Sequence, residues 1–269
     1  MEKEGKISVI MGIYNCASTL PEAIGSILSQ TYTNWELILC DDASTDQTYQ
    51  IAESFQRHYP DKIKLLRNEV NSKLAYTLNH CLKYASGEFI ARMDGDDISS
   101  LDRFEKEVNY LRANSEVQLV GAAMQQFNDD QGKMRIIHKP EHPDRWTLHK
   151  QIPFHHATIM TYKYVYDALG GYTDSERTIR VEDYDLWFRF FAKGFQGANI
   201  NEVLYFVRED LDAIKRRTFK ARLNGFKTSV YGYKLLGYPR RWLINELYVM
   251  ILKSIVPSKL VALYRRYRI

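Results

Sequence analysis

The 269-residue chain is 45% apolar and 26% charged, which is ordinary for a globular protein with a sizeable core. No secretory signal is expected, because residues 1–6 are charged, and the longest apolar stretch, residues 242–256, is too short and too polar to span a bilayer. The net charge of +4 conceals a division: residues 211–269 hold 14 basic and two acidic side chains, so the remainder is net acidic.

The first ninety residues repeat a short apolar strand followed by a helical stripe. Two helices are expected to begin in capping boxes, in which a hydroxyl and a Glu or Gln side chain exchange bonds with the backbone: Thr19 with Glu22, and Ser44 with Gln47. Strands are expected over residues 6–12, 35–40, 63–66 and 88–93. Strand–helix alternation with short connections predicts an α/β fold, a mostly parallel sheet with helices on both faces.

Polar residues follow three of these strands at their carboxyl ends: Tyr14-Asn15, Asp41-Asp42 and Asp94 to Asp97. In parallel α/β sheets, ligands bind in the crevice beyond those ends. The convergence of three polar clusters on one crevice therefore favours a nucleotide-binding site.

The fourth strand ends in three carboxylates, Asp94, Asp96 and Asp97, around Gly95. Like charges this close repel one another, and Mg²⁺ or Mn²⁺ bridging to phosphate is the expected remedy. Asp-rich loops also serve as simple turns or helix caps, and that alternative stays open. A calcium loop of the EF-hand type is excluded, because Ile98 and Ser99 occupy the positions that need an oxygen ligand and a glycine.

The pattern beyond residue 100 is less regular. Residues 127–133 resemble a hairpin turn, residues 139–153 an irregular exposed segment, and Gly170-Gly171 and Gly194 close helices. Helices are expected over 101–113, 164–169 and from 180 onward, and strands over 117–124, 154–160 and 204–207. Cys16, Cys40 and Cys81 lack metal-ligand spacing and are expected to be thiols in a reducing cytosol.

The order and spacing of several motifs resemble the family 2 glycosyltransferases, above all bacterial enzymes of exopolysaccharide and capsule synthesis. The resemblance runs from residue 6 to 210 and rests on residues 9–15, 30–32, 41–46, 91–97, 170–172 and 182–187. It implies a Rossmann-like GT-A catalytic domain over residues 1–210 and inverting transfer of a sugar from a nucleoside diphosphate donor. Gly12 departs from the family, where many members carry proline.

The resemblance also implies roles for individual residues. Asp42 would bind the base, uracil in many members, with Tyr14 and Asn15 near it. Asp94 and Asp96 would form the Asp-x-Asp pair, directed to ribose and to Mn²⁺ or Mg²⁺, and Asp97 would share the metal. Asp183 matches the catalytic base. Its place at a helix N-terminus is expected to favour the ionised form, although a plain capping acid is the alternative.

Five further residues are candidates for acceptor or phosphate contact: His156, Glu182, Trp187, Arg92 and Arg208. His156 matches a position where the family often has histidine, and a satisfied buried histidine is equally expected there. Trp187 lies four residues after Asp183, on the same helix face, where it could contact an acceptor sugar. The two arginines could neutralise either phosphate or buried acids.

Residues 211–269 are expected to form a basic amphipathic helical extension with the clusters 215–217, 240–241 and 265–266. Because the resembled enzymes commonly use lipid-diphosphate acceptors, the extension is expected to meet the anionic inner leaflet, placing a cytoplasmic protein at the membrane face. The alternative is that these helices pack on the acidic part of the chain. Nucleic-acid binding is not favoured, since no known binding motif accompanies the charge.

Of three competing functions, the loop after the first strand disfavours two. Sugar-nucleotide pyrophosphorylases carry a glycine-rich, Arg-bearing loop after the first strand, and NAD enzymes carry Gly-x-Gly-x-x-Gly, whereas residues 14–18 fit neither. A partner-binding protein that keeps the fold and acts by contact is not excluded. The intact acids Asp42, Asp96 and Asp183 indicate only that the means for catalysis are retained.

Overall fold

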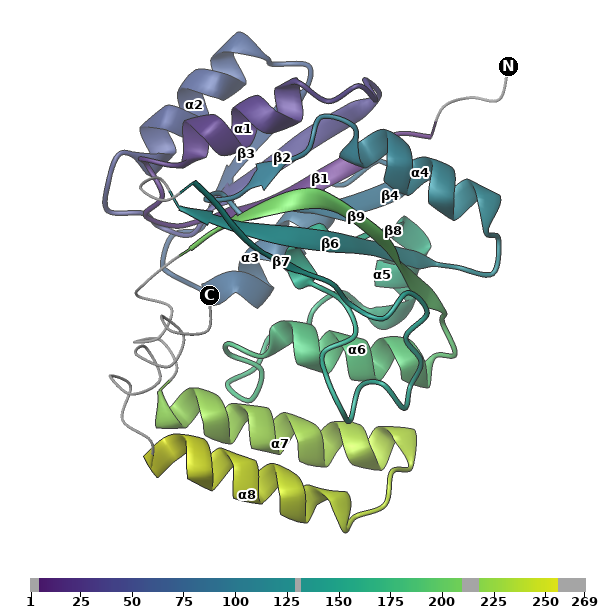
Figure 1. The fold of residues 1–269 in the computed structure, drawn as a ribbon. Helices are drawn as coiled ribbons and strands as arrows, with labels where there is room; N and C mark the ends of the chain where they lie inside the picture. Colours follow the sequence, from purple (N-terminus) through teal and green to yellow (C-terminus); the bar gives the residue numbers. More distant parts are fainter. Residues whose placement is uncertain (1–4, 129–131, 210–217, 256–269) are drawn as a thin grey trace.

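The computed structural model describes residues 5–128, 132–209 and 218–255 (Figure 1). Four short apolar strands pair in parallel in the order β3-β2-β1-β4. They are β1 (Ile7–Ile13), β2 (Trp35–Asp41), β3 (Ile63–Arg67) and β4 (Phe89–Arg92). The central strand β1 aligns Ile7 with both Trp35 and Phe89, so the strands end near the same level. The parallel sheet expected from the strand–helix alternation is confirmed.

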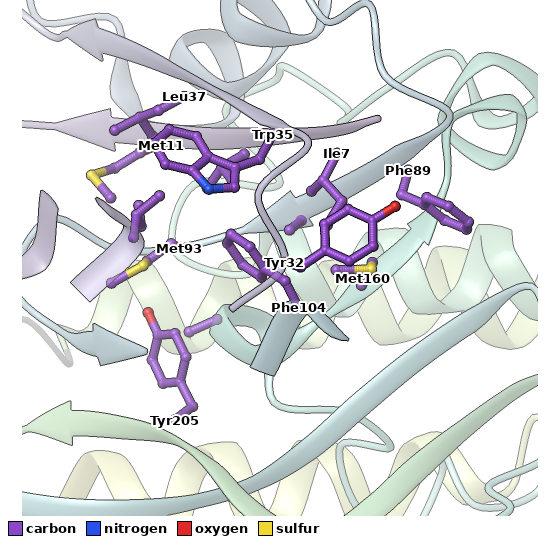
Figure 2. Close-up of a cluster of buried hydrophobic side chains, with 14 of the residues drawn as sticks. Ile7, Met11, Tyr32, Trp35, Leu37, Phe89, Met93, Phe104, Met160 and Tyr205 are labelled. Carbon is purple, nitrogen blue, oxygen red and sulfur yellow. The ribbon is translucent and has the colours of Figure 1, made fainter. Parts of the chain in front are cut away.

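Helices cover both faces of the sheet, also as expected (Figure 1). One face carries α1 (Leu20–Leu28), α2 (Thr48–His58) and α4 (Arg103–Ala113), and the other α3 (Lys73–Leu82), α5 (Lys163–Leu169) and α6 (Glu182–Ala192). Each helix turns an apolar stripe to the sheet, which gives two hydrophobic clusters. Figure 2 shows the first cluster, in which Met11 and Trp35 of the parallel strands and Phe104 of α4 lie among its labelled side chains.

The second half of the sheet is mixed. Here β8 (Met160–Tyr162) pairs antiparallel with β4, β6 (Leu119–Asn128) with β8, and β9 (Gly197–Arg208) pairs parallel with β6. At the margins, β5 (Ile98–Ser99) pairs with β9, and β7 (Gly132–Ile137) forms the expected hairpin with β6. The tip of that hairpin, residues 129–131, lies outside the described residues.

Two C-terminal helices, α7 (Phe219–Leu236) and α8 (Trp242–Ile255), form a layer beyond α6 (Figure 1). Gly237, with φ of +67°, ends α7 in the left-handed conformation that glycine adopts most readily. Gly232 allows α7 to approach α6, because a Cβ there would lie 2.2 Å from the Phe188 ring. The basic clusters at 215–217 and 265–266 lie outside the described residues.

Both expected capping boxes are wrong, although Thr19 does occupy the N-cap position of α1. The Thr19 hydroxyl donates to the carbonyl oxygens of Cys16, at 3.2 Å, and Gly95, at 3.1 Å. The Ser44 hydroxyl accepts the Asn15 N–H at 3.0 Å, and α2 begins only at Thr48. These hydroxyls tie neighbouring loops to one another, and this tertiary bonding outcompetes local capping.

The strand expected over residues 154–160 is also wrong. A 3₁₀ turn, η1 (His156–Thr158), occupies its middle, and β8 starts at Met160. The Thr158 hydroxyl accepts the Ala122 N–H at 3.1 Å, so a side chain takes the place of a strand contact with β6. Burial of Phe154 and Ile159 had produced the apolar pattern of a strand.

Candidate active site

A cavity of about 680 Å³ lies at the carboxyl ends of the parallel strands, where the sheet topology predicts a ligand site. One wall comes from the end of β1 with Tyr14 and Cys16, from Asp42, from the start of α3, and from Arg92 and residues 94–96. A second wall comes from the segment 174–180, apart from Arg177, and from Glu182. All three polar clusters identified in the sequence therefore contribute to the cavity. The first contributes Tyr14, the second Asp42, and the third the acids on either side of Gly95.

Asp42 is held as a hydrogen-bond acceptor. Its Oδ1 accepts the Ser72 N–H at 2.7 Å and the Asn68 side-chain amide at 2.9 Å, and its Oδ2 accepts the Lys73 N–H at 3.0 Å. Lys73 has a φ of +73°, in the left-handed region that non-glycine residues seldom adopt. Because each carboxylate oxygen has two acceptor positions, Asp42 can still accept an N–H donor from a ligand in the cavity.

The left-handed backbone is concentrated here. Among the described residues, the non-glycine residues with positive φ are Asn15, Ala43, Lys73 and Arg180. Lys73 and Arg180 line the cavity, and the other two directly follow the lining residues Tyr14 and Asp42. Such conformations cost roughly 1 kcal/mol each and persist where the surrounding structure enforces them, which is common at ligand sites. Asn15 accepts the Thr45 N–H at 2.9 Å and so links the loops after β1 and β2.

The three carboxylates after β4 come together as expected. Oxygen atoms of Asp94, Asp96 and Asp97 lie within 4.8 Å of one another. Burial, followed by the charges of Asp94 and Asp96, raises the pKa of Asp97 well above its usual range. A set of hard oxygen ligands under mutual repulsion fits Mg²⁺ or Mn²⁺.

Both arginine candidates bind these acids directly. The almost fully buried Arg92 forms an ion pair with Asp94 and lines the cavity. Arg208 donates its backbone N–H to Asp97 at 2.9 Å and its Nε–H to the Asp96 carbonyl at 3.1 Å, and it pairs with Glu22 of α1. Arg92 therefore has both a structural contact and access to a ligand, whereas the contacts of Arg208 hold the acidic loop.

Glu182 and Asp183 open α6, and of the two Glu182 lines the cavity. Burial, with the neighbouring charge of Asp183, raises the pKa of Glu182 to about 7. Burial also raises the pKa of Asp183, although the Tyr184 N–H and the Arg92 charge oppose the shift. The N-terminus of α6 was expected to favour the ionised form of Asp183, but desolvation of the carboxylate has the larger effect on its pKa. A carboxylate with a raised pKa is a stronger proton acceptor, which suits a base.

His156 and Trp187 lie deeper. His156 Nε2 lies 2.8 Å from the Tyr172 hydroxyl, and burial, followed by the Arg92 charge, lowers its pKa well below the usual value. Trp187 has no exposed surface and packs edge-on against Phe154 and His156. Its burial does not fit the expected contact with an acceptor sugar, because α6 turns that face to the second hydrophobic cluster rather than to the cavity.

Sequence reasoning missed the wall formed by residues 174–180. No motif marks this segment, apart from its place directly before the acids that open α6. The contribution of Ser72 and Lys73 was also missed, yet they follow the carboxyl end of β3, so the crevice rule applied to the other strands would have identified them.

Helix α7 supports that missed wall. The Asn224 side chain donates to the Ile179 carbonyl at 3.1 Å, and Arg177 donates to the Thr228 hydroxyl at 3.2 Å. Arg177 also pairs with the fully buried Asp185 of α6 at 2.7 Å. The first C-terminal helix is therefore part of the frame of the cavity.

Comparison with known proteins agrees with this geometry. The family described as "Glycosyl transferase family 2" matches residues 8–182. EpsE of Bacillus subtilis (strain 168) is 45% identical over 271 residues, spanning 100% of this chain and 96% of EpsE. The Escherichia coli "UDP-Gal:alpha-D-GlcNAc-diphosphoundecaprenol beta-1,3-galactosyltransferase" is 30% identical over 237 residues, 85% of this chain and 84% of that protein.

Among solved structures, the fold is similar to the mannosyltransferase PcManGT from Pyrobaculum calidifontis, solved with GDP-Man and Mn²⁺. The TM-score is 0.66 at 16% identity, covering 99% of this chain and 81% of that one. This likeness confirms the GT-A fold.

Proposed function

The chain belongs to glycosyl transferase family 2, and we propose that it transfers a sugar, with inversion, from a UDP-sugar to a hydroxyl of a lipid-linked glycan. At the coarser level it is a glycosyltransferase of polysaccharide biosynthesis. One observation carries the finer proposal: a single cavity is lined by Asp42, Asp94, Asp96 and Glu182, and Asp183 follows Glu182 at the start of α6.

The wall after the parallel strands takes the nucleotide. Asp42, fixed by two backbone N–H groups, accepts the N–H of the base, and Tyr14, which is about half exposed, lies against it, with Asn15 holding the loop. The printed name of the Escherichia coli relative specifies a UDP-sugar donor, which supports uracil as the base. Asp94 faces the ribose and the diphosphate.

Asp96, Asp94 and Asp97 would hold Mn²⁺ or Mg²⁺. When bound, the metal would supply positive charge to the departing diphosphate. Mn²⁺ in the PcManGT structure supports this assignment. Arg92 meanwhile forms an ion pair with Asp94 that holds its carboxylate in place.

Asp183 takes the proton of the attacking acceptor hydroxyl. The new bond between that oxygen and the sugar carbon forms on the face opposite the diphosphate, whose bond to the carbon breaks, so one base suffices for inversion. Glu182, which lines the cavity, positions the acceptor. His156, whose Nε2 lies 2.8 Å from the Tyr172 hydroxyl, does not line the cavity, so we assign it no contact with the acceptor.

We place the acceptor on a lipid diphosphate at the cytoplasmic face of the membrane, where the protein makes peripheral contact. The acceptor named for the Escherichia coli relative is a diphosphoundecaprenol-linked sugar, which supports this choice. Among the described helices, none combines the length and apolarity that a bilayer span requires. A lipid-borne substrate therefore calls for contact from outside the bilayer.

The decisive experiment incubates the purified full chain with a panel of UDP- and GDP-sugars in Mn²⁺, Mg²⁺ or chelator. Slow hydrolysis of one UDP-sugar that needs metal is expected, with faster consumption when a lipid diphosphate-linked acceptor is added. Hydrolysis of no UDP-sugar in any metal, or equal rates in chelator, would contradict the proposal. Asp42→Asn serves as the donor-site control and should weaken UDP-sugar use.

A further inference from the structure

We propose that α8 docks in the plane of an anionic membrane surface and inserts its outward apolar row into the lipid. This inference deepens the proposed function, since it names the surface by which the protein meets its lipid-borne acceptor.

The outward face of α8 is apolar rather than polar. Ile244 is 71% exposed, Tyr248 62% and Ile251 46%, and Leu247 and Leu252 are exposed beside them. Spacings of three, four, seven and eight residues place all five on one side of the helix. A surface helix of a protein that meets only water normally shows the opposite pattern.

The inner side of α8 is satisfied by α7. Glu246, the acid within residues 242–255, accepts the Tyr233 hydroxyl of α7 at 2.9 Å. Trp242 at the start of α8 stacks on His149, with ring centroids 4.1 Å apart, and packs against Tyr238. Helix α8 is therefore held in place by contacts on its inner side, and the exposed apolar row belongs to a packed helix.

Positive charge accompanies this row. Lys220, Lys227 and Lys234, at intervals of seven, are exposed on α7, and Arg240 and Arg241 are exposed just before α8. Because Glu246 is bonded inward, the apolar row itself carries no carboxylate within the described residues. Exposed cations beside an apolar helix face complement anionic headgroups above an acyl layer, and each cation near such a surface contributes about 1 kcal/mol.

The dimensions fit a helix that lies on the surface. Over its 14 described residues, α8 is about 21 Å long, less than the roughly 30 Å thickness of a hydrocarbon core. The outward face of α8 is apolar, and the exposed cations lie on α7 and just before α8.

The docking surface and the cavity belong to one framework. Helix α8 packs on α7, and α7 holds the wall at residues 174–180 through Asn224 and Thr228. Docking through α8 thus places the Glu182 side of the cavity on the part of the molecule attached to the lipid.

The test measures flotation of the full chain with vesicles of phosphatidylcholine alone and of phosphatidylcholine mixed with phosphatidylglycerol. The protein is expected to float with the anionic vesicles and to remain partly bound at high salt, because apolar insertion is not screened. Ile244→Ser with Ile251→Ser should lower the partition coefficient by about tenfold or more, through lost apolar burial. Lys220→Gln, Lys227→Gln and Lys234→Gln together should weaken binding mainly at low salt.

The matched control is Leu101→Ser with Ile136→Ser, two exposed apolar residues outside the helical layer, which should bind vesicles as the wild type does. Melting temperatures and UDP binding should be unchanged in every variant, since all sites are exposed. Failure of the wild type to float with anionic vesicles overturns the proposal, as does wild-type flotation of the isoleucine variant. If the wild type binds no vesicles but forms a dimer in solution, and the isoleucine variant is a monomer, the apolar row is the contact with a second copy of the chain.

UDP binding separates this inference from the proposed function. If the protein floats with vesicles but binds no UDP, docking through α8 is supported and the UDP-sugar donor is rejected. If it binds UDP but does not float, the donor is supported and docking through α8 is rejected.

Discussion

The two walls of the cavity are built in different ways. The nucleotide wall follows consecutive strand ends, and its Asp42 is held by backbone N–H groups of Ser72 and Lys73. The second wall is a loop, residues 174–180, whose Arg177 pairs with Asp185 of α6 and donates to Thr228 of α7. Backbone bonds survive most substitutions, whereas a side-chain staple is lost with one residue. The first wall should therefore fail chemically when mutated, and the second structurally.

The largest effect is expected on the nucleotide wall. Asp96→Asn should lower turnover by about 10³-fold or more, because a metal at a departing phosphate contributes several kcal/mol. The ligand-free protein should melt no earlier than the wild type, since one of three mutually repelling carboxylates becomes neutral. Steady-state kinetics and a thermal melt measure both quantities. Near-normal turnover of this variant would remove Asp96 from the metal site.

Asp183→Asn tests whether the second wall also carries chemistry. Turnover should fall by about 10²- to 10³-fold through loss of the base, while UDP-sugar affinity stays unchanged. Kinetics in both substrates together with calorimetric titration of the donor measure these values. If the variant loses affinity for the donor but retains turnover, Asp183 binds the donor and is not the base.

The pH profile sharpens the same assignment. The base works when ionised, and burial raises the pKa of Asp183, so kcat/KM should fall on acidification at a higher pH than an exposed aspartate would give. Glu182→Gln removes a neighbouring negative charge and should shift that acid limb to lower pH. An unshifted limb would mean that the two carboxyls titrate independently.

The structural weakness of the second wall is tested by Asp185→Ala. This buried carboxylate pairs with Arg177 at 2.7 Å and Arg189 at 2.8 Å, so its loss should lower the free energy of unfolding by about 3–5 kcal/mol. Denaturant unfolding measures it. The control Glu53→Gln breaks an exposed pair with Arg57 and should cost at most about 0.5 kcal/mol. Equal costs would erase the contrast between the walls.

The smallest effect is ligand stabilisation of the first wall. UDP at one hundred times its dissociation constant stabilises the folded protein by about 2.7 kcal/mol. With Mn²⁺ present, the melting shift should clearly exceed that with chelator, because the acidic cluster and the diphosphate share the ion. Identical shifts in the two conditions would speak against a shared metal.

The same contrast explains what could be predicted from the sequence. The apolar strands and the polar residues that follow them form a local, repeated pattern. The sequence therefore predicts the parallel sheet and a crevice that brings Asp42 near the acids after β4. Hydrogen bonds between residues distant in sequence follow no local pattern. The Thr19 hydroxyl bonds to Gly95 rather than capping its own helix, and residues 156–158 form a turn where an apolar strand was expected. Trp187 was placed by helical spacing alone, which cannot distinguish a face toward the core from one toward a ligand.

The bond from the Arg208 N–H to Asp97 joins residues 111 positions apart and has a consequence for how the protein is made. The acids that follow β4 leave the ribosome long before β9, whose last residue is Arg208, and until then their loop lacks this anchor. Contacts so distant in sequence form late and slow folding. A growing chain thus carries its three carboxylates without their anchor for about a hundred residues of synthesis. A stall or truncation between residues 97 and 208 leaves a chain that has β4 and its acids but lacks the bond from the Arg208 N–H to Asp97.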